Sequence, residues 1–280
     1  MISIRRARSD DLDFLLELVN HADVEPFLGG RAGRDRESVA SELERSDSDP
    51  TAFGRFVIEV DGRRAGSMGF EVANRRSRIA HLERLAVHPD LRGRRVADDA
   101  ARLLQRHLVE ELGYHRLQLE IYGFNERAQR HAERAGFVRE GVRRRAYWRH
   151  GEWMDGVLYA LIREDLDVPG PLTLLHDYVM VHNDCVRTGD WKLLGEWFTE
   201  DSELEFKSVP VGPFAGRAEI VAAYERRPPD DEVVIFGART EGEEVVASYG
   251  WLREPAKPAG EMIVTVRDDR IRKLLVTFSA

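Results

Sequence analysis

The sequence predicts two α+β domains in one chain, a mixed α/β sheet followed by a smaller α+β cone. Three observations predict this organisation. Strand and helix patterns alternate along the first half and end in an antiparallel hairpin, as in a single-sheet domain. The segment 167–171 (DVPGP) then interrupts the pattern with the composition of a linker. Behind it, three helical patterns and several strands indicate a separate core. We therefore expect domains at 1–167 and 168–280.

Bulk properties are those of a globular protein. With 280 residues, the chain is long enough for two cores, and 42% hydrophobic and 33% charged residues are ordinary values. No apolar run approaches the roughly 20 residues of a membrane span, and the N-terminus has no signal-peptide core. Cys185, the single cysteine, excludes an internal disulfide framework. These features predict a cytoplasmic protein without a membrane partner.

The first domain is predicted to contain two helices and a hairpin before its central strand. Ser9-Asp10-Asp11 forms the cap of a first helix. Asp61-Gly62 is a hairpin signal. The elements in chain order are a strand at 3–7, a helix from residue 12, a glycine-rich turn at 29–33, a helix at 36–46, strands at 55–60, 65–72 and 79–87, a helix from residue 96, a strand at 117–122, a helix at 125–134, and strands at 138–145 and 153–162.

The stretch 81–104 reads as a strand, a turn and a helix. Pro89 ends the strand, and apolar residues from Val96 to Leu108 recur at the spacing of one helix face. On the strand, alternation predicts that His81, Glu83 and Leu85 share one face. The basic, glycine-containing turn presents free N–H groups and the positive end of a helix dipole, which together form a site for a phosphate. The alternative is that Gly93 is an ordinary turn glycine.

Charge is distributed unevenly. Residues 51–150 carry 21 basic and 13 acidic side chains, whereas residues 151–280 carry 14 and 25. The basic part contains the phosphate-site turn, where it would attract a polyanionic cofactor, although a solvated helix face explains the same residues. The overall net charge of −8 and the lack of basic stripes with interleaved aromatics argue against nucleic-acid binding.

The turn at 92–97 resembles motif A of the GNAT acyltransferases, whose pattern is Arg or Gln, two residues, Gly, one residue, and then Gly or Ala. Arg92 and Ala97 fill the ends of that pattern, and Arg95 stands at the middle glycine. In the family this glycine lets the backbone approach the pyrophosphate of acetyl-CoA. Two further stretches match at the family's spacing: 119–137, and 141–166, which is similar to the RimJ/RimL branch.

The resemblance implies an N-acetyltransferase that uses acetyl-CoA as co-substrate and transfers the acyl group to an amine of a small molecule or a peptide N-terminus. It also implies a set of residues that contact the cofactor. These are Leu85, Ala86, Val87, Arg92, Gly93, Arg94, Arg95, Val96, Ala97 and Asn125.

Acyl transfer to an amine needs a group that accepts the ammonium proton. Glu120 stands where similar amine acetyltransferases have a general base, and Glu83 and His81 stand at central-strand positions that other family members use. The alternatives are that Glu120 only pairs with an arginine and that His81 is a surface residue. The family's thiolate-protonating tyrosine would fall on Ala132, which leaves Tyr147, Tyr122, water or an unassisted thiolate.

The second domain is predicted to begin with an amphipathic helix at 172–188, with Leu175, Tyr178, Val179, His182, Cys185 and Val186 on one face. The remaining elements are a short helix at 191–198, a strand at 203–207, a helix at 217–226, and strands at 233–240, 244–253, 260–267 and 271–278. This half resembles the nuclear transport factor 2-like, or SnoaL-like, cone fold through 188–191 (TGDW), 198–201 (FTED) and 214–220 (FAGRAEI).

Ketosteroid isomerases of this fold have a base aspartate and an oxyanion tyrosine. Here the place of the aspartate falls near Phe206 and Lys207, and the place of the tyrosine falls on His182. Isomerase chemistry is therefore unsupported. No His/Cys cluster has metal-ligand spacing, so no metal is expected.

Three hypotheses remain open for the whole chain. The first is an active N-acetyltransferase fused to a cone that binds a ligand or partner. The second is a non-catalytic acyl-CoA or ligand sensor. The third is a SnoaL-like isomerase or cyclase with an accessory first domain. A homodimer is compatible with each of them.

Overall fold

The computed structural model describes residues 1–28 and 34–279, so the predicted turn at 29–33 lies outside the described residues. The chain divides into two compact units. The first comprises Met1–Val109 and Tyr114–Leu166, and the second comprises Glu110–Gly113 and Asp167–Ala280. The short stretch Glu110–Gly113 therefore groups with the C-terminal unit, which the sequence did not suggest.

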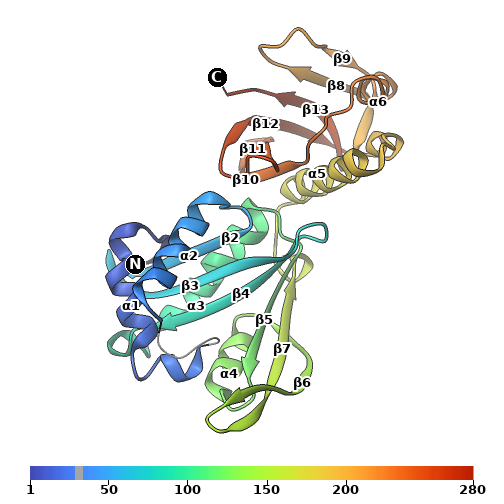
Figure 1. Cartoon of the computed structure of the whole chain (residues 1–280). Coiled ribbons are helices and arrows are strands. Elements are labelled where there is room, and N and C mark those ends of the chain that lie inside the picture. Colours follow the sequence, from blue (N-terminus) through green and yellow to red (C-terminus); the bar gives the residue numbers. More distant parts are fainter. Residues whose placement is uncertain (29–33, 280) are drawn as a thin grey trace. The chain divides into compact units, whose positions relative to one another are not determined.

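The first unit is built on a mixed sheet of seven strands in the order β1-β2-β3-β4-β5-β7-β6 (Figure 1). All neighbouring strands are antiparallel except β4 and β5, which are parallel. The strands are β1 (Ile2–Arg6), β2 (Phe53–Val60), β3 (Arg63–Asn74), β4 (Ile79–Val87), β5 (Arg116–Tyr122), β6 (Val138–Arg149) and β7 (Glu152–Ile162).

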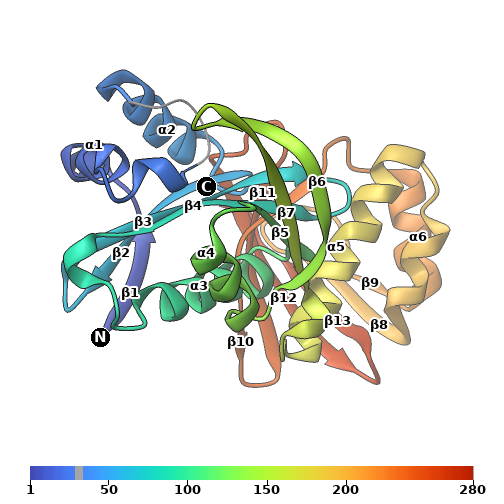
Figure 2. The same cartoon turned by 90° about the horizontal axis from the view of Figure 1, so that it is seen from below.

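Helices cover both faces of this sheet, with α1 and α2 on one side and α3 and α4 on the other (Figure 2). The helices are α1 (Leu12–Asn20), α2 (Arg36–Ser48), α3 (Val96–Arg106) and α4 (Glu126–Arg134), and a π-helical turn, His107–Glu111, follows α3. On the α1/α2 side, Leu15, Val39 and Leu43 pack against Val57 of β2. This burial removes apolar surface from water and fixes the two helices on the sheet.

Strands β4 and β5 separate after a short paired region. Only Ile79–His81 and Arg116–Gln118 are in register, so the second halves of both strands have no partner on that side. Figure 1 shows the two strands diverging. The gap lies where β4 leads into the turn before α3, and it creates space within an otherwise continuous sheet.

A β-bulge in β4 changes which side chains share a face. Glu83 pairs with Gly69 and Ala86 with Ser67, so two residues of β4, Arg84 and Leu85, lie opposite one residue of β3, Met68. The extra residue is accommodated at Arg84, whose φ is +60°. Glu83 and Ala86 therefore share a face, and the prediction that Leu85 lies on the face of His81 and Glu83 is wrong. A bulge inserts one residue and shifts the alternation that follows it.

The second unit contains a six-stranded sheet in the order β10-β11-β12-β13-β8-β9, in which only the pair β13 and β8 is parallel. Its elements are α5 (Gly170–Thr188), a 3-10 helix (Lys192–Trp197), β8 (Phe198–Phe206), β9 (Phe214–Ala215), α6 (Arg217–Arg226), β10 (Val233–Glu241), β11 (Glu244–Trp251), β12 (Pro258–Arg267) and β13 (Arg270–Val276). Strand β8 begins earlier than the sequence predicted, because Phe198 already pairs with Ile271 of β13.

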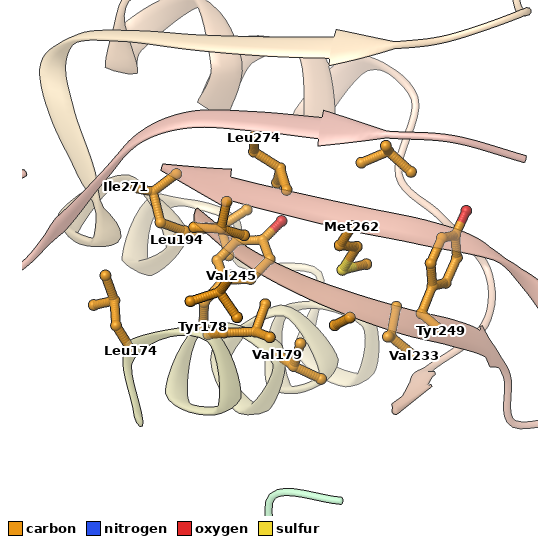
Figure 3. Packing of buried hydrophobic residues seen from close by; sticks show 14 of the residues in the cluster. Leu174, Tyr178, Val179, Leu194, Val233, Val245, Tyr249, Met262, Ile271 and Leu274 are labelled. Carbon is orange, nitrogen blue, oxygen red and sulfur yellow. The ribbon is translucent and has the colours of Figure 1, made fainter. Parts of the chain in front are cut away.

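Helix α5 supplies one side of the core of this unit. Leu175, Tyr178, Val179, His182 and Cys185 are buried, and Val186 packs against them partly buried. Figure 3 shows Tyr178 and Val179 of α5 facing Val245, Met262 and other side chains of the sheet. Within the described residues, no helix is both long enough and apolar enough to cross a membrane.

Candidate active site

A cavity of about 1000 Å³ occupies the gap between β4 and β5. It is lined by the three predicted bases, Glu120, Glu83 and His81. It is also lined by every predicted cofactor-binding residue except Arg94: Leu85, Ala86, Val87, Arg92, Gly93, Arg95, Val96, Ala97 and Asn125. The structure therefore brings the two predicted sets of residues together around one cavity.

The turn before α3 accommodates an arginine where motif A has glycine. Arg95 is the N-cap of α3 and has left-handed backbone angles, φ 57° and ψ 15°. Gly93 is also left-handed, with φ +82°, and a Cβ there would meet nothing within 4 Å. A side chain at a left-handed position costs about 1 kcal/mol relative to glycine but does not block the conformation. The departure at Arg95 is therefore compatible with the turn.

Arg92 connects this turn to β4 and to the loop after α1 by hydrogen bonds. Its Nε donates to the carbonyl of Val87 at the end of β4 (3.2 Å), and its Nη2 donates to the carbonyl of Asp23 (3.0 Å). Burial and the nearby Arg127 lower the pKa of Arg92. An anion placed between these two guanidinium groups would relieve their repulsion, which is the electrostatics a pyrophosphate requires.

Asp98 lies in the first turn of α3, where its charge would oppose a phosphate. It contacts two side chains of α4: His131 Nδ1 lies 2.7 Å and Arg134 Nη2 lies 3.4 Å from its Oδ1. Burial opposes ionisation of Asp98, but His131 and Arg134 together outweigh it and hold the pKa of the carboxyl below its usual value. The charge of Asp98 is thus largely neutralised within the protein.

Asn125 caps α4. Its Oδ1 accepts a hydrogen bond from the backbone N–H of Ala128 (3.1 Å), which satisfies one of the free donors at the start of that helix. The residue lines the cavity, but this contact alone gives its side chain a structural role.

Glu120 reaches into the cavity from β5. Its Oε2 accepts a hydrogen bond from Arg143 Nη1 (2.9 Å), while its buried Oε1 has no hydrogen-bond partner among the described residues. Gly156 of β7 makes room for this oxygen, since a Cβ there would lie 1.9 Å from Oε1. Pairing with an arginine, the structural alternative for Glu120, is therefore present, but it occupies only one of the two oxygens.

Glu83 and His81 lie on the same face of the sheet as Glu120. His81 pairs with Gln118 of β5, and residues two apart on a strand share a face. The Oε1 of Glu83 lies 3.2 Å from Arg84 Nε, so its charge is engaged by the residue next to it. Of the three candidates, Glu120 has a buried oxygen with no hydrogen-bond partner among the residues that the structure describes.

Tyr147 stands beside Glu120. Burial and the neighbouring Glu120 carboxylate raise the pKa of Tyr147 to about 12, so the hydroxyl stays protonated at neutral pH. The ring of Tyr147 meets that of Tyr122 edge-on, with centroids 5.2 Å apart, and both line the cavity. Ala132, at the place of the family's tyrosine, is buried.

Sequence reasoning missed Gly156 and Arg143, which shape the surroundings of Glu120. A glycine inside a strand pattern is a signal for close approach of another group, and Gly156 carried that signal. No comparable signal marked Arg143, one of several arginines in succession. Within the described part of the chain, no three His, Cys, Asp or Glu side chains are grouped to hold a metal ion.

Comparisons with known proteins agree with this geometry. A family model described as acetyltransferase (GNAT) domain matches residues 2–138. An uncharacterised N-acetyltransferase, YokL, of Bacillus subtilis is 26% identical over 138 residues, which cover 49% of this chain and 74% of that protein. Spermidine N(1)-acetyltransferase of Escherichia coli is 23% identical over 156 residues, covering 56% of this chain and 83% of the relative.

Solved structures show the same fold. Spermidine N-acetyltransferase of Vibrio cholerae, in complex with CoA and spermine, has a TM-score of 0.55 at 19% identity and covers 59% of this chain and 96% of its own. RimL, a ribosomal L7/L12 alpha-N-protein acetyltransferase in complex with coenzyme A, has a TM-score of 0.53 at 18% identity, with 57% and 93% covered. Residues 2–138 of this chain therefore match the acetyltransferase (GNAT) domain, and the first unit has the fold of the solved N-acetyltransferases.

Proposed function

We propose that the first unit transfers the acetyl group of acetyl-CoA to an amine of a small molecule or a peptide N-terminus, with Glu120 as the general base. One observation carries this proposal: β4 and β5 diverge around a cavity lined by Glu120, whose Oε1 has no hydrogen-bond partner among the described residues. An amine must lose its proton before it attacks the thioester, and a positioned carboxylate is a suitable acceptor.

In this proposal the turn 92–97 binds the pyrophosphate of acetyl-CoA. Its support is the N-terminus of α3, the two left-handed residues Gly93 and Arg95, and the guanidinium groups of Arg92 and Arg127 that line the same cavity. Backbone N–H groups at a helix start and nearby arginines are a common phosphate site. On the side that faces β5, the second half of β4, including Leu85, Ala86 and Val87, offers backbone groups to the pantetheine arm.

Tyr147 is the proposed proton donor to the departing thiolate. Its support is that it lines the cavity and that its raised pKa keeps the hydroxyl protonated. The family's usual tyrosine position holds Ala132, so a donor from β6 would replace one from α4.

The substitution Glu120→Gln tests the base. It preserves shape but removes the proton acceptor, so the acetylation rate should fall on the order of 10²-fold or more while coenzyme A affinity stays nearly unchanged. Glu140→Gln is the matched control, because Glu140 also pairs with an arginine, Arg116, across strands but does not line the cavity. An unchanged rate for Glu120→Gln across a panel of amines would remove Glu120 from this role.

For the second unit, residues 168–280 in the predicted boundaries, we propose a cone that binds a ligand or partner and takes no part in the chemistry. Isomerase chemistry lacks its base there, since Phe206 and Lys207 occupy that place. His182, at the place of the oxyanion tyrosine, is buried against the rings of Trp191 and Tyr224, and burial lowers the pKa of His182 to about 4. This neutral histidine is part of the core.

A further inference from the structure

Three arginines converge on one carboxylate beside the cavity. Glu42 of α2 pairs with Arg34, with Arg55 of β2 (2.6 Å) and with Arg84 of the β4 bulge. Arg84 is also 3.2 Å from Glu83 through its Nε. We call these five residues the Glu42 cluster. It lies on the face of the sheet that α1 and α2 cover, which is also the face of Glu83.

The Glu42 cluster has more positive than negative groups. Three guanidinium groups face two carboxylates, and every member is at most 24% exposed. Arg55 is 3% exposed and its Nη1 has no hydrogen-bond partner among the described residues. Burial, reinforced by the charge of Arg84, lowers the pKa of Arg55 to about 10. A buried excess cation is costly unless an anion joins it.

Arg84 is the member of the cluster that can meet such an anion. It lines the cavity together with Glu83, Met68 and Gly69. Its Nη1 donates to Glu42, whereas its Nη2 donates no hydrogen bond to any described residue. A guanidinium whose Nη2 is not engaged can still donate a hydrogen bond to a carboxylate.

Gly69 lines the cavity without a side chain that would separate the cavity from Arg55. A Cβ at residue 69 would lie 2.8 Å from the carbonyl oxygen of Gly54 and 3.2 Å from Arg55 Nη1. Position 69 therefore suits glycine, and the charge of Arg55 lies directly behind the cavity lining. Arg55 adds to the potential there without reaching into the cavity itself.

We propose that the amine acceptor carries a carboxylate, which binds Arg84 while its amine faces Glu120. This inference rests on the proposed function, because it concerns the acceptor of the same site. It distinguishes this chain from acetyltransferases of polyamines, whose substrates carry no anion. The acceptor class is thus amino acids or related amino carboxylates.

Product binding tests the proposal without requiring turnover. Calorimetry on the full chain saturated with coenzyme A would compare the N-acetyl derivatives of glycine, β-alanine, 4-aminobutyrate and phenylalanine with the corresponding amides. At least one acid should bind tenfold or more tightly than its amide, the size expected for a charge-assisted hydrogen bond. Arg84→Gln should reduce this preference below about threefold, and Arg84→Lys, which keeps only the charge, should give an intermediate value.

Arg45→Gln is the matched control. Arg45 of α2 pairs with Glu71 outside the cavity, so this variant should retain the preference of the wild type. Coenzyme A affinity and circular dichroism report whether each variant is folded. Equal binding of acids and amides, no binding of any acid up to about 10 mM, or an unchanged preference in folded Arg84→Gln would each overturn the inference. Failure of the proposed function would appear differently, as absent acetyl transfer or an unaffected Glu120→Gln rate.

Discussion

The absence of a side chain at Gly156 leaves room for the Glu120 carboxylate, so Gly156→Ala should impair catalysis with little loss of stability. The new Cβ would lie 1.9 Å from Glu120 Oε1, where ordinary contacts begin at 3.4 Å. The carboxylate must therefore retreat by about 1.5 Å, and a displacement of about 1 Å at a reacting group can cost on the order of 10²-fold in rate. We expect kcat to fall by about that factor, equivalent to about 2.7 kcal/mol of transition-state stabilisation.

The new Cβ would also lie 2.9 Å from Tyr147 Cε2. Both collisions are with side chains and not with backbone, so stability should change by no more than about 1 kcal/mol. The assay is steady-state acetylation beside urea unfolding of the same variant. Gly141→Ala is the control, since a Cβ at residue 141 of the neighbouring strand would meet nothing within 4 Å.

A double variant separates displacement of Glu120 from other effects. If Gly156→Ala acts only by moving Glu120, it should add nothing to the loss already caused by Glu120→Gln. The reasoning would be refuted if the rate losses of the two single variants multiplied in the double variant. An unchanged kcat in Gly156→Ala alone would refute it as well.

Two further predictions concern one residue in each unit. Arg95→Gly relieves the left-handed strain before α3, so the free energy of unfolding in urea should rise by about 1 kcal/mol. Coenzyme A affinity should be kept or tightened. A tenfold loss of affinity by calorimetry would show instead that the Arg95 side chain binds the cofactor. His182 has a folded-state pKa of about 4, below its ordinary value of 6.5, so its burial contributes stability that is complete above pH 6.5 and is lost as the pH falls toward 4. The loss should reach about 3 kcal/mol, and an equal pH dependence in His182→Gln would contradict this assignment.

Local patterns were sufficient to predict most of the elements. Three examples are the hairpin turn at Asp61-Gly62, the start of α3 at Val96 and the helix at Arg217–Arg226. They follow from turn residues and helix periodicity, which act over a few neighbouring residues. The residues of motif A predicted the cofactor turn for the same reason. The identity of the catalytic group, by contrast, remained a choice among three side chains.

Only tertiary contacts decided how those side chains are arranged. The bulge at Arg84 moved Leu85 away from the face of Glu83, although strict alternation placed them together. It depends on pairing with β3, because a bulge is defined by the residues on the opposite strand. Its physical cause therefore lies outside the strand's own sequence.

The sequence by itself determined the two-part organisation, the order of elements and the residues around the cavity. The tertiary structure decided that one oxygen of Glu120 lies beside Gly156 without a hydrogen-bond partner among the described residues. It also decided that Arg34, Arg55 and Arg84 share Glu42. These arrangements join residues from separate helices and strands. Charge and proton-transfer chemistry depend on distances of a few ångströms, and the folded chain sets those distances where sequence spacing does not.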